Sequence, residues 1–136
     1  MSALSDPEQD RVRQVKEYYD STNALYLEHL GSTFQAGLIS VDGRPVGPNQ
    51  HTRILAARAG LQPGMRVLDA GCGVCGPALE IARAIEGVVV DGVTISPEQL
   101  RTAEERIRAA GMEARVRVRQ ADYHALPFAE GEFDAV

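Results

Sequence analysis

The chain has 136 residues, with 14 lysine and arginine residues against 19 aspartate and glutamate residues, and its formal net charge is −5. This length is enough for one domain with a hydrophobic core, and the negative balance gives no electrostatic reason to expect nucleic-acid binding. No apolar run approaches the roughly 20 residues of a membrane span, and the N-terminus lacks the pattern of a signal peptide. We therefore expect a soluble, cytoplasmic protein.

The N-terminal segment favours a helix. Asp6 can cap it, and Pro7 suits its first position. Apolar side chains then recur at helical spacing as far as Tyr18 and Tyr19. Turn-forming residues at 20–23 predict that this helix is interrupted there.

Two further short helices are expected before the pattern changes. The first spans residues 24–30, and a surface crossing over 34–39 and a polar loop over 42–48 follow it. The second helix spans about 50–59 and ends at a glycine. Residues 1–60 therefore form a helical segment and linker, which we separate from a second unit over residues 61–136.

Strands and helices alternate from residue 65 onward. Strands are expected over 66–70, 88–94 and 115–119, with a fourth beginning at 133, and helices over 77–85 and 96–110. Such alternation implies a parallel sheet with right-handed crossovers. Arginine alternates with valine over 115–119, which places charge on one face of the strand and is typical of an edge strand. The fold class is therefore α/β.

A glycine-rich turn follows the first of these strands. Apolar residues lead into Asp69, and Gly71, Gly73 and Gly76 come directly after it, just before a helix. Glycine lets the backbone approach a ligand closely, and a helix N-terminus favours ligand oxygens. This arrangement predicts a nucleotide-binding turn.

Two classes of cofactor use such a turn. The spacing Gly71-x-Gly73-x-x-Gly76 matches the dinucleotide fingerprint, and Asp91 lies about 20 residues further on, where a ribose-binding acid would be expected. Asp69 favours the other class, because its carboxylate would repel a pyrophosphate but would suit a ligand with an ammonium group and a sulfonium. An NAD(P)-dependent oxidoreductase remains the alternative.

Several motifs together resemble class I S-adenosylmethionine-dependent methyltransferases. They are residues 67–73, residues 122–128 and the strand at 133–136, and their spacing fits as well. Residues 60–69 and 92–99 are most similar to the cyclopropane fatty acid synthase and sterol C-methyltransferase branch. The resemblance implies a Rossmann-like, doubly wound sheet with an N-terminal helical lid, of which about the first half is present.

The resemblance also implies S-adenosylmethionine as the cofactor and a set of residues that bind it. Tyr18 and Tyr19 match a lid motif, although both could instead form an apolar stripe packed on the sheet. The expected cofactor-binding residues are Tyr18, Tyr19, Phe34, Gln35, Asp69, Gly71, Cys72, Gly73, Thr94, Gln99, Asp122 and Tyr123.

Thr94 stands where most class I methyltransferases have an acidic residue at the end of the second strand. The resembled cyclopropane synthase branch has threonine there with a glutamine five residues on, and this chain has the same pair in Thr94 and Gln99. By resemblance Gln99 serves the ribose hydroxyls, because an amide both donates and accepts. Its other possible role is the third position of a capping box that begins at Ser96. We favour the cofactor contact over the cap, and over Asp91 as a ribose acid.

Asp122 and Tyr123 follow the third strand. By resemblance the Asp122 carboxylate accepts from the adenine amino group and Tyr123 lies beside the adenine ring; the alternative for Asp122 is a turn cap. His124 is an isolated loop histidine to which we assign no chemistry. No catalytic residue is assigned.

The cysteines Cys72 and Cys75 form a C-x-x-C at a helix N-terminus. This spacing can mean a redox pair with lowered thiol pKa values, but two cysteines alone cannot make a structural zinc site, and we assign no metal. Both lie in a turn that needs small side chains, so we favour a steric role. Cys75 departs from the resembled family, which often has glycine there.

The implied activity is methyl transfer to a small hydrophobic or natural-product-like acceptor, with carbon favoured over oxygen or nitrogen. Residues beyond the fourth strand carry catalytic groups in the resembled family. We therefore expect that this chain alone is inactive and is completed by a missing C-terminal half, or that it forms a homo-oligomer. A non-catalytic cofactor-binding module is the remaining alternative.

Overall fold

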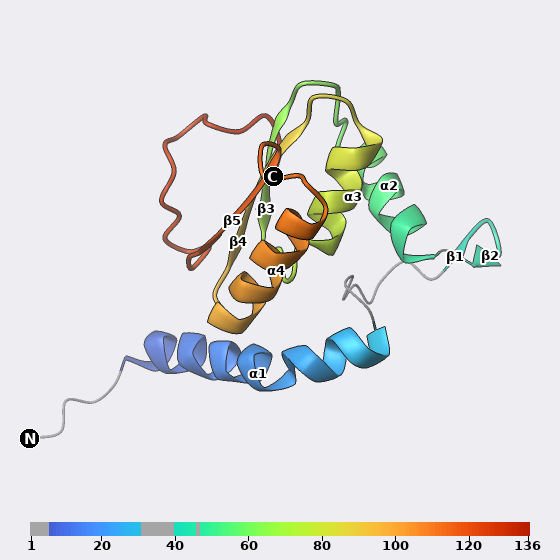
Figure 1. Ribbon diagram of the computed structural model, residues 1–136. Coiled ribbons are helices and arrows are strands. Elements are labelled where there is room, and N and C mark those ends of the chain that lie inside the picture. Colours follow the sequence, from blue (N-terminus) through green and yellow to red (C-terminus); the bar gives the residue numbers. More distant parts are fainter. Residues whose placement is uncertain (1–5, 31–39, 46) are drawn as a thin grey trace, which may run out of the picture.

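The computed structural model describes residues 6–30, 40–45 and 47–136 (Figure 1). The elements in chain order are α1 (Pro7–Leu30), β1 (Ser40–Val41), β2 (Arg44–Pro45), α2 (Pro48–Arg58), β3 (Arg66–Ala70), α3 (Gly76–Ala84), β4 (Val89–Thr94), α4 (Pro97–Ala109) and β5 (Val116–Gln120). Within these ranges, no helix combines the length and the hydrophobicity that a membrane crossing requires.

A parallel sheet in the order β3-β4-β5 is the centre of the fold. Val67 pairs with Val90, and Val90 pairs with Val116 on its other side. Three of the four predicted strands and their parallel order are confirmed, and β5 lies at the edge as its arginine–valine alternation indicated. The fourth strand, expected from residue 133, is not formed as a strand and is represented by a single bridge. Ala135 adds a parallel bridge to Val67 on the free side of β3, and the Leu68 amide donates to the Ala135 carbonyl at 3.0 Å.

Helices α3 and α4 share one hydrophobic cluster with the sheet. Small residues dominate it, which lets the helices approach the strands closely. Its members are Val67, Cys72, Cys75, Ala78, Leu79, Ala82, Val88, Val90, Ala103, Ile107 and Val116. The cluster joins the sheet, the turn after β3 and the two helices into one core.

Arg115 closes the opposite end of this layer. Its guanidinium donates to the carbonyl oxygens of Ile85 at 2.7 Å and Val88 at 3.0 Å. These carbonyls follow the last turn of α3, where unpaired acceptors favour a cation. A residue that the sequence assigned only to a charged edge strand therefore ties β5 to the end of α3.

Helix α1 is continuous, so the predicted interruption at residues 20–23 was wrong. Ser21 and Thr22 donate their hydroxyl protons back to the Tyr18 carbonyl, at 3.0 and 2.7 Å, and remain helical. Asp20 and Asn23 bond across to α4. Such side chains disrupt a helix by hydrogen-bonding to nearby backbone groups. Here the side chains of Asp20 and Asn23 bond instead to residues at the start of α4 and within it.

The polar loop expected over residues 42–48 contains more structure than predicted. β1 and β2 form an antiparallel hairpin around Asp42 and Gly43, whose φ angles are 49° and 74°. Asp-Gly with two positive φ values is the composition that two-residue hairpin turns favour. Pro48 then begins α2, which packs on α3.

Candidate cofactor site

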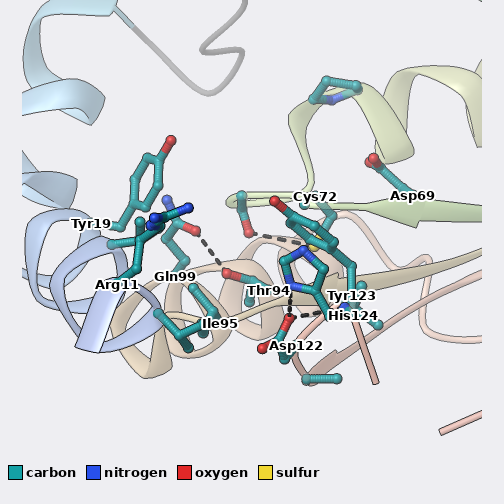
Figure 2. Close-up of a pocket in the computed structure, with 17 residues that line it drawn as sticks. Arg11, Tyr19, Asp69, Cys72, Thr94, Ile95, Gln99, Asp122, Tyr123 and His124 are labelled. Atoms are coloured by element: carbon teal, nitrogen blue, oxygen red, sulfur yellow. Dashed lines mark hydrogen bonds and ion pairs between the residues drawn. The ribbon is translucent and has the colours of Figure 1, made fainter. Parts of the chain in front are cut away.

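A cavity of about 340 Å³ opens where β3 and β4 end. Figure 2 shows its lining: the turn after β3, the end of β4 with the start of α4, the segment after β5, and one side of α1. Ligand sites in open parallel sheets lie at the carboxyl ends of strands, as this one does. The expected nucleotide-binding turn forms one wall.

The turn at residues 71–73 is built on backbone geometry that glycine accepts most readily. Gly71 and Gly73 have φ angles of 84° and 55°. The amides of Gly71 and Cys72 donate to the Val93 carbonyl at 3.0 and 2.9 Å, which ties the turn to β4. Glycine has no Cβ at these positions, so the backbone is open to a ligand.

Asp69 is the unpaired acid of this wall. Its Oδ2 atom is buried and has no hydrogen-bond partner within the part of the chain that the structure describes. Burial raises the pKa of the Asp69 carboxyl to about 6. A buried, unpaired carboxylate oxygen costs free energy unless a donor or cation reaches it, so the cavity presents a position suited to an ammonium group.

The two competing roles of Gln99 are separated by the structure. Its backbone amide donates to the Ser96 hydroxyl at 3.1 Å, which is the helix cap. Its side chain does not complete the capping box, since the Ser96 amide donates to Thr94 Oγ1 at 3.2 Å instead. The Gln99 side-chain oxygen accepts from Thr94 Oγ1 at 2.8 Å, and both side chains line the cavity.

The segment after β5 contributes Asp122, Tyr123 and His124. Asp122 Oδ1 accepts from the His124 amide at 2.9 Å and lies 2.9 Å from the His124 Nδ1 atom. The Tyr123 and His124 rings lie 4.6 Å apart. Asp122 therefore caps a turn with Oδ1 and still faces the cavity, which makes the two alternatives for this residue compatible.

Helix α1 supplies the opposite side of the cavity. Tyr19 lines it, together with three residues that sequence reasoning missed: Arg11, Val12 and Val15. Tyr18 is not in the lining, and its ring packs edge-on against that of Tyr19, with centroids 5.3 Å apart. The helical spacing of the apolar residues was the signal for this wall. Phe34 and Gln35 lie outside the described residues.

The cysteine pair is part of the packing beneath the turn. Cys72 and Cys75 are buried and unbridged. A hydrogen bond with Cys75, together with burial, raises the pKa of the Cys72 thiol. A raised pKa disfavours the thiolate that redox chemistry needs, so the geometry supports the steric role that we favoured.

Asp91 faces away from the cavity. Its Oδ2 atom accepts from Arg66 Nε at 2.9 Å, and Arg66 also pairs with Glu132 at 2.8 Å. The side chain is 2% exposed and is absent from the lining. Asp91, which made the dinucleotide alternative attractive, therefore belongs to a partly buried ion pair between β3 and β4.

Two further observations concern the side chains of this site. His124, to which we assigned no role, does reach the lining. Among residues 6–30, 40–45 and 47–136, no group of three or more histidine, cysteine, aspartate or glutamate side chains is arranged to hold a metal ion.

Comparison with known protein families matches residues 6–136 to the profile of the mycolic acid cyclopropane synthetases. The chain belongs to this family. The match includes α1 as well as the sheet, so the helical wall of the cavity lies within the matched region.

Individual relatives agree with this assignment. A cycloartenol-C-24-methyltransferase from Arabidopsis thaliana is 36% identical over 123 residues, which are 90% of this chain and 36% of that enzyme. The structure of the [4+2]-cyclase SpnF superposes with a TM-score of 0.81 at 32% identity, over 91% of this chain and 48% of that one. An S-adenosylmethionine-dependent methyltransferase from Thiobacillus denitrificans, solved with S-adenosyl-L-homocysteine, gives a TM-score of 0.56 at 27% identity, over 66% of this chain and 36% of that one. The chain thus spans about a third to a half of the length of these relatives.

Proposed function

We propose that this chain binds S-adenosylmethionine and forms the cofactor-binding part of a methyltransferase that acts on a hydrophobic acceptor. The observation that carries the proposal is the unpaired, buried Asp69 oxygen beside a glycine turn that is open to a ligand. Family membership supports it. In this proposal residues 61–136 hold the nucleotide, and residues 1–60 provide a helical cover.

The described residues fit this cofactor at each of its ends. Asp69 accepts from the ammonium of the amino-acid end, and the backbone at Gly71 and Gly73 allows close approach. Gln99 serves the ribose hydroxyls, since its side-chain nitrogen is not used in the bond to Thr94. Asp122 accepts from the adenine amino group, beside the Tyr123 ring.

In this proposal, methyl transfer needs little general acid–base catalysis from the residues of this chain. The bound cofactor supplies a methyl carbon that the adjacent sulfonium makes electrophilic. This chain's residues orient that group and keep water away from it, which is how enzymes align a displacement. The plant relative is named for methylation at a carbon, which supports a carbon acceptor in the complete protein.

A second candidate function follows from the structural relative SpnF. That protein is named a [4+2]-cyclase, although it shares this fold closely. Because that name describes a reaction other than methyl transfer, the alternative proposal is that this cavity binds the cofactor without transferring its methyl group. Transfer of a radiolabelled methyl group from S-adenosylmethionine to a terpenoid alkene would support the methyltransferase and exclude a purely binding role.

Calorimetric titration tests the cofactor directly. We expect the chain to bind S-adenosylhomocysteine at micromolar concentration and NADH much more weakly. Asp69→Asn keeps the shape but removes the charge, and should weaken S-adenosylhomocysteine binding about tenfold or more. Glu104→Gln removes a charge from an exposed position on α4 and serves as the matched control.

The outcomes separate the candidates. Tight NADH binding without S-adenosylhomocysteine binding would overturn the proposal in favour of an oxidoreductase. Equal weakening by Asp69→Asn and Glu104→Gln would show that Asp69 acts only through net charge, and would remove the observation on which the proposal depends.

A further inference from the structure

Asp20 joins the middle of α1 to the N-terminus of α4. The Ser96 hydroxyl donates to Asp20 Oδ1 at 2.5 Å, and Lys16 Nζ lies 3.0 Å from Asp20 Oδ2. One turn further along, Asn23 Nδ2 donates to Thr102 Oγ1 at 3.2 Å. Figure 1 shows α1 lying crosswise below the N-terminal end of α4. Polar groups therefore make the junction between these two helices.

Several large apolar side chains of α1, among those that the structure describes, are not buried at this junction. Val15, Tyr18 and Leu25 remain 43, 49 and 56% exposed. Asn23 is buried at the junction, and it is polar. Where the apolar side chains of a helix stay exposed, polar bonds do more to set its position.

Ser96 connects this junction to the cofactor cavity. Its hydroxyl oxygen also accepts from the Gln99 amide, and its own amide donates to Thr94 Oγ1. Thr94 in turn donates to the Gln99 side chain. Asp20 is therefore bonded to the residue that caps α4 and that fixes Thr94 and Gln99 in the lining.

We infer that Asp20 is a positioning residue of the cofactor site, which holds the α1 wall and the Thr94–Gln99 pair against a bound nucleotide. The inference rests on the proposed function. Asp20 touches no part of the cavity itself; Tyr19, the residue before it, lines the cavity and is placed by the same bonds.

A carboxylate suits this position better than an amide. It accepts from Ser96 with one oxygen and from Lys16 with the other, and the positive end of the α4 dipole favours its charge. Asparagine at this position would still accept from Ser96 but would lose the ion pair and the charge. Asp20→Asn therefore removes the ion pair with Lys16, and Asp20→Ala removes the bond to Ser96 as well.

The test combines cofactor affinity with amide hydrogen exchange. We expect S-adenosylhomocysteine to bind about tenfold more weakly to Asp20→Ala and about threefold more weakly to Asp20→Asn. Glu17→Gln, one turn away on an exposed position of α1, should bind like the unchanged chain. Without ligand, exchange in residues 7–30 should accelerate in Asp20→Ala while β3 and β4 exchange at their original rates.

The outcomes are distinguishable from those for the proposed function. If the unchanged chain fails to bind S-adenosylhomocysteine, the proposed function fails, and this inference fails with it. If the unchanged chain binds but Asp20→Ala binds equally well, only the positioning role is overturned. Faster exchange throughout β3 and β4 in both Asp20 variants would also overturn it, because the residue would then support the fold rather than the site.

Discussion

The turn after β3 and helix α1 face each other across one cavity, yet the chain fixes them in different ways. Behind the turn, Val74, Cys75 and Val90 are completely buried, and the turn amides bond to β4. On α1, Val15 is 43% exposed and Asp20 supplies the attachment. The cofactor-binding backbone is therefore part of the hydrophobic core, whereas the opposite wall is held by a few polar bonds. Substitutions behind the turn should therefore destabilise the fold, whereas substitutions on α1 should alter the position of that helix without unfolding the sheet.

The largest effect on stability is expected from Gly92→Ala, which places a new atom in the core behind the turn. A Cβ atom at Gly92 would lie 2.8 Å from Cys72 Sγ and 2.9 Å from Cys72 Cβ, closer than real side chains approach. We expect the free energy of unfolding to fall by about 3 kcal/mol because the turn must shift away from β4. Urea denaturation measures this change.

A compensating change checks the cause of that loss. Cys72→Gly removes the two atoms nearest to the new Cβ and leaves Cys75 Sγ at 3.4 Å, so the double variant Cys72→Gly/Gly92→Ala should recover part of the lost free energy. A double variant no more stable than Gly92→Ala alone would show that contact with Cys72 is not responsible.

Cofactor affinity should depend on pH through Asp69. Burial raises the pKa of this carboxyl to about 6, from an ordinary value of 3.8. An ammonium group needs the charged form, so S-adenosylhomocysteine affinity should fall about tenfold between pH 7 and pH 5. Calorimetry across this range checks the prediction, and Asp69→Asn should bind weakly without this pH dependence.

The stability of the ligand-free chain should change in the opposite direction. Between pH 3.8 and about 6 the folded chain binds more protons at Asp69 than the unfolded chain does. The Asp69 contribution to the free energy of unfolding therefore falls as pH rises through this window and stays low above it. A contribution that rose with pH, relative to Asp69→Asn, would contradict the assigned cause.

The core side was also the part that could be predicted from sequence. The bounds of β3, β4 and β5 followed to within one residue from their apolar patterns. Their parallel order followed from the alternation of strands and helices, and the edge position of β5 from its alternation of arginine and valine. The cavity residues Asp69, Gly71 and Gly73 were found because a glycine turn after a strand is a local signal. A local sequence pattern of this kind can be interpreted without knowing which distant residues it contacts.

The continuity of α1 and its attachment to α4 escaped prediction because their determinants are not local. Residues 20–23 carry turn chemistry, but Asp20 and Asn23 bond to Ser96 and Thr102, which are more than 70 positions away. Arg11 gives no signal of its own in the sequence. Similarly, the role of Gln99 depended on whether Thr94 or the helix cap would take its side chain.

A smaller effect is expected at Cys75, which sits on the core side in a strained conformation. Its φ and ψ angles are 62° and 26°, in the left-handed region that favours glycine. Cys75→Ala and Cys75→Gly both remove the buried sulfur, but only glycine relieves the strain. Cys75→Gly should therefore be more stable than Cys75→Ala by about 1 kcal/mol, as thermal unfolding can measure. Equal stability of the two variants would mean that the turn relaxes around alanine.

The smallest effect is expected on the α1 side, from Tyr19→Ala. Tyr19 lines the cavity and Tyr18 does not, although both rings are partly exposed and pack against each other. An aromatic face near a sulfonium contributes about 0.5–1 kcal/mol at an exposed site, so Tyr19→Ala should bind S-adenosylmethionine two- to fivefold more weakly. S-adenosylhomocysteine lacks the positive sulfur and should lose less. Tyr18→Ala is the matched control and should leave the ratio of the S-adenosylmethionine and S-adenosylhomocysteine affinities unchanged. If this ratio changed equally in both variants, the tyrosines would act by supporting α1 rather than by facing the ligand.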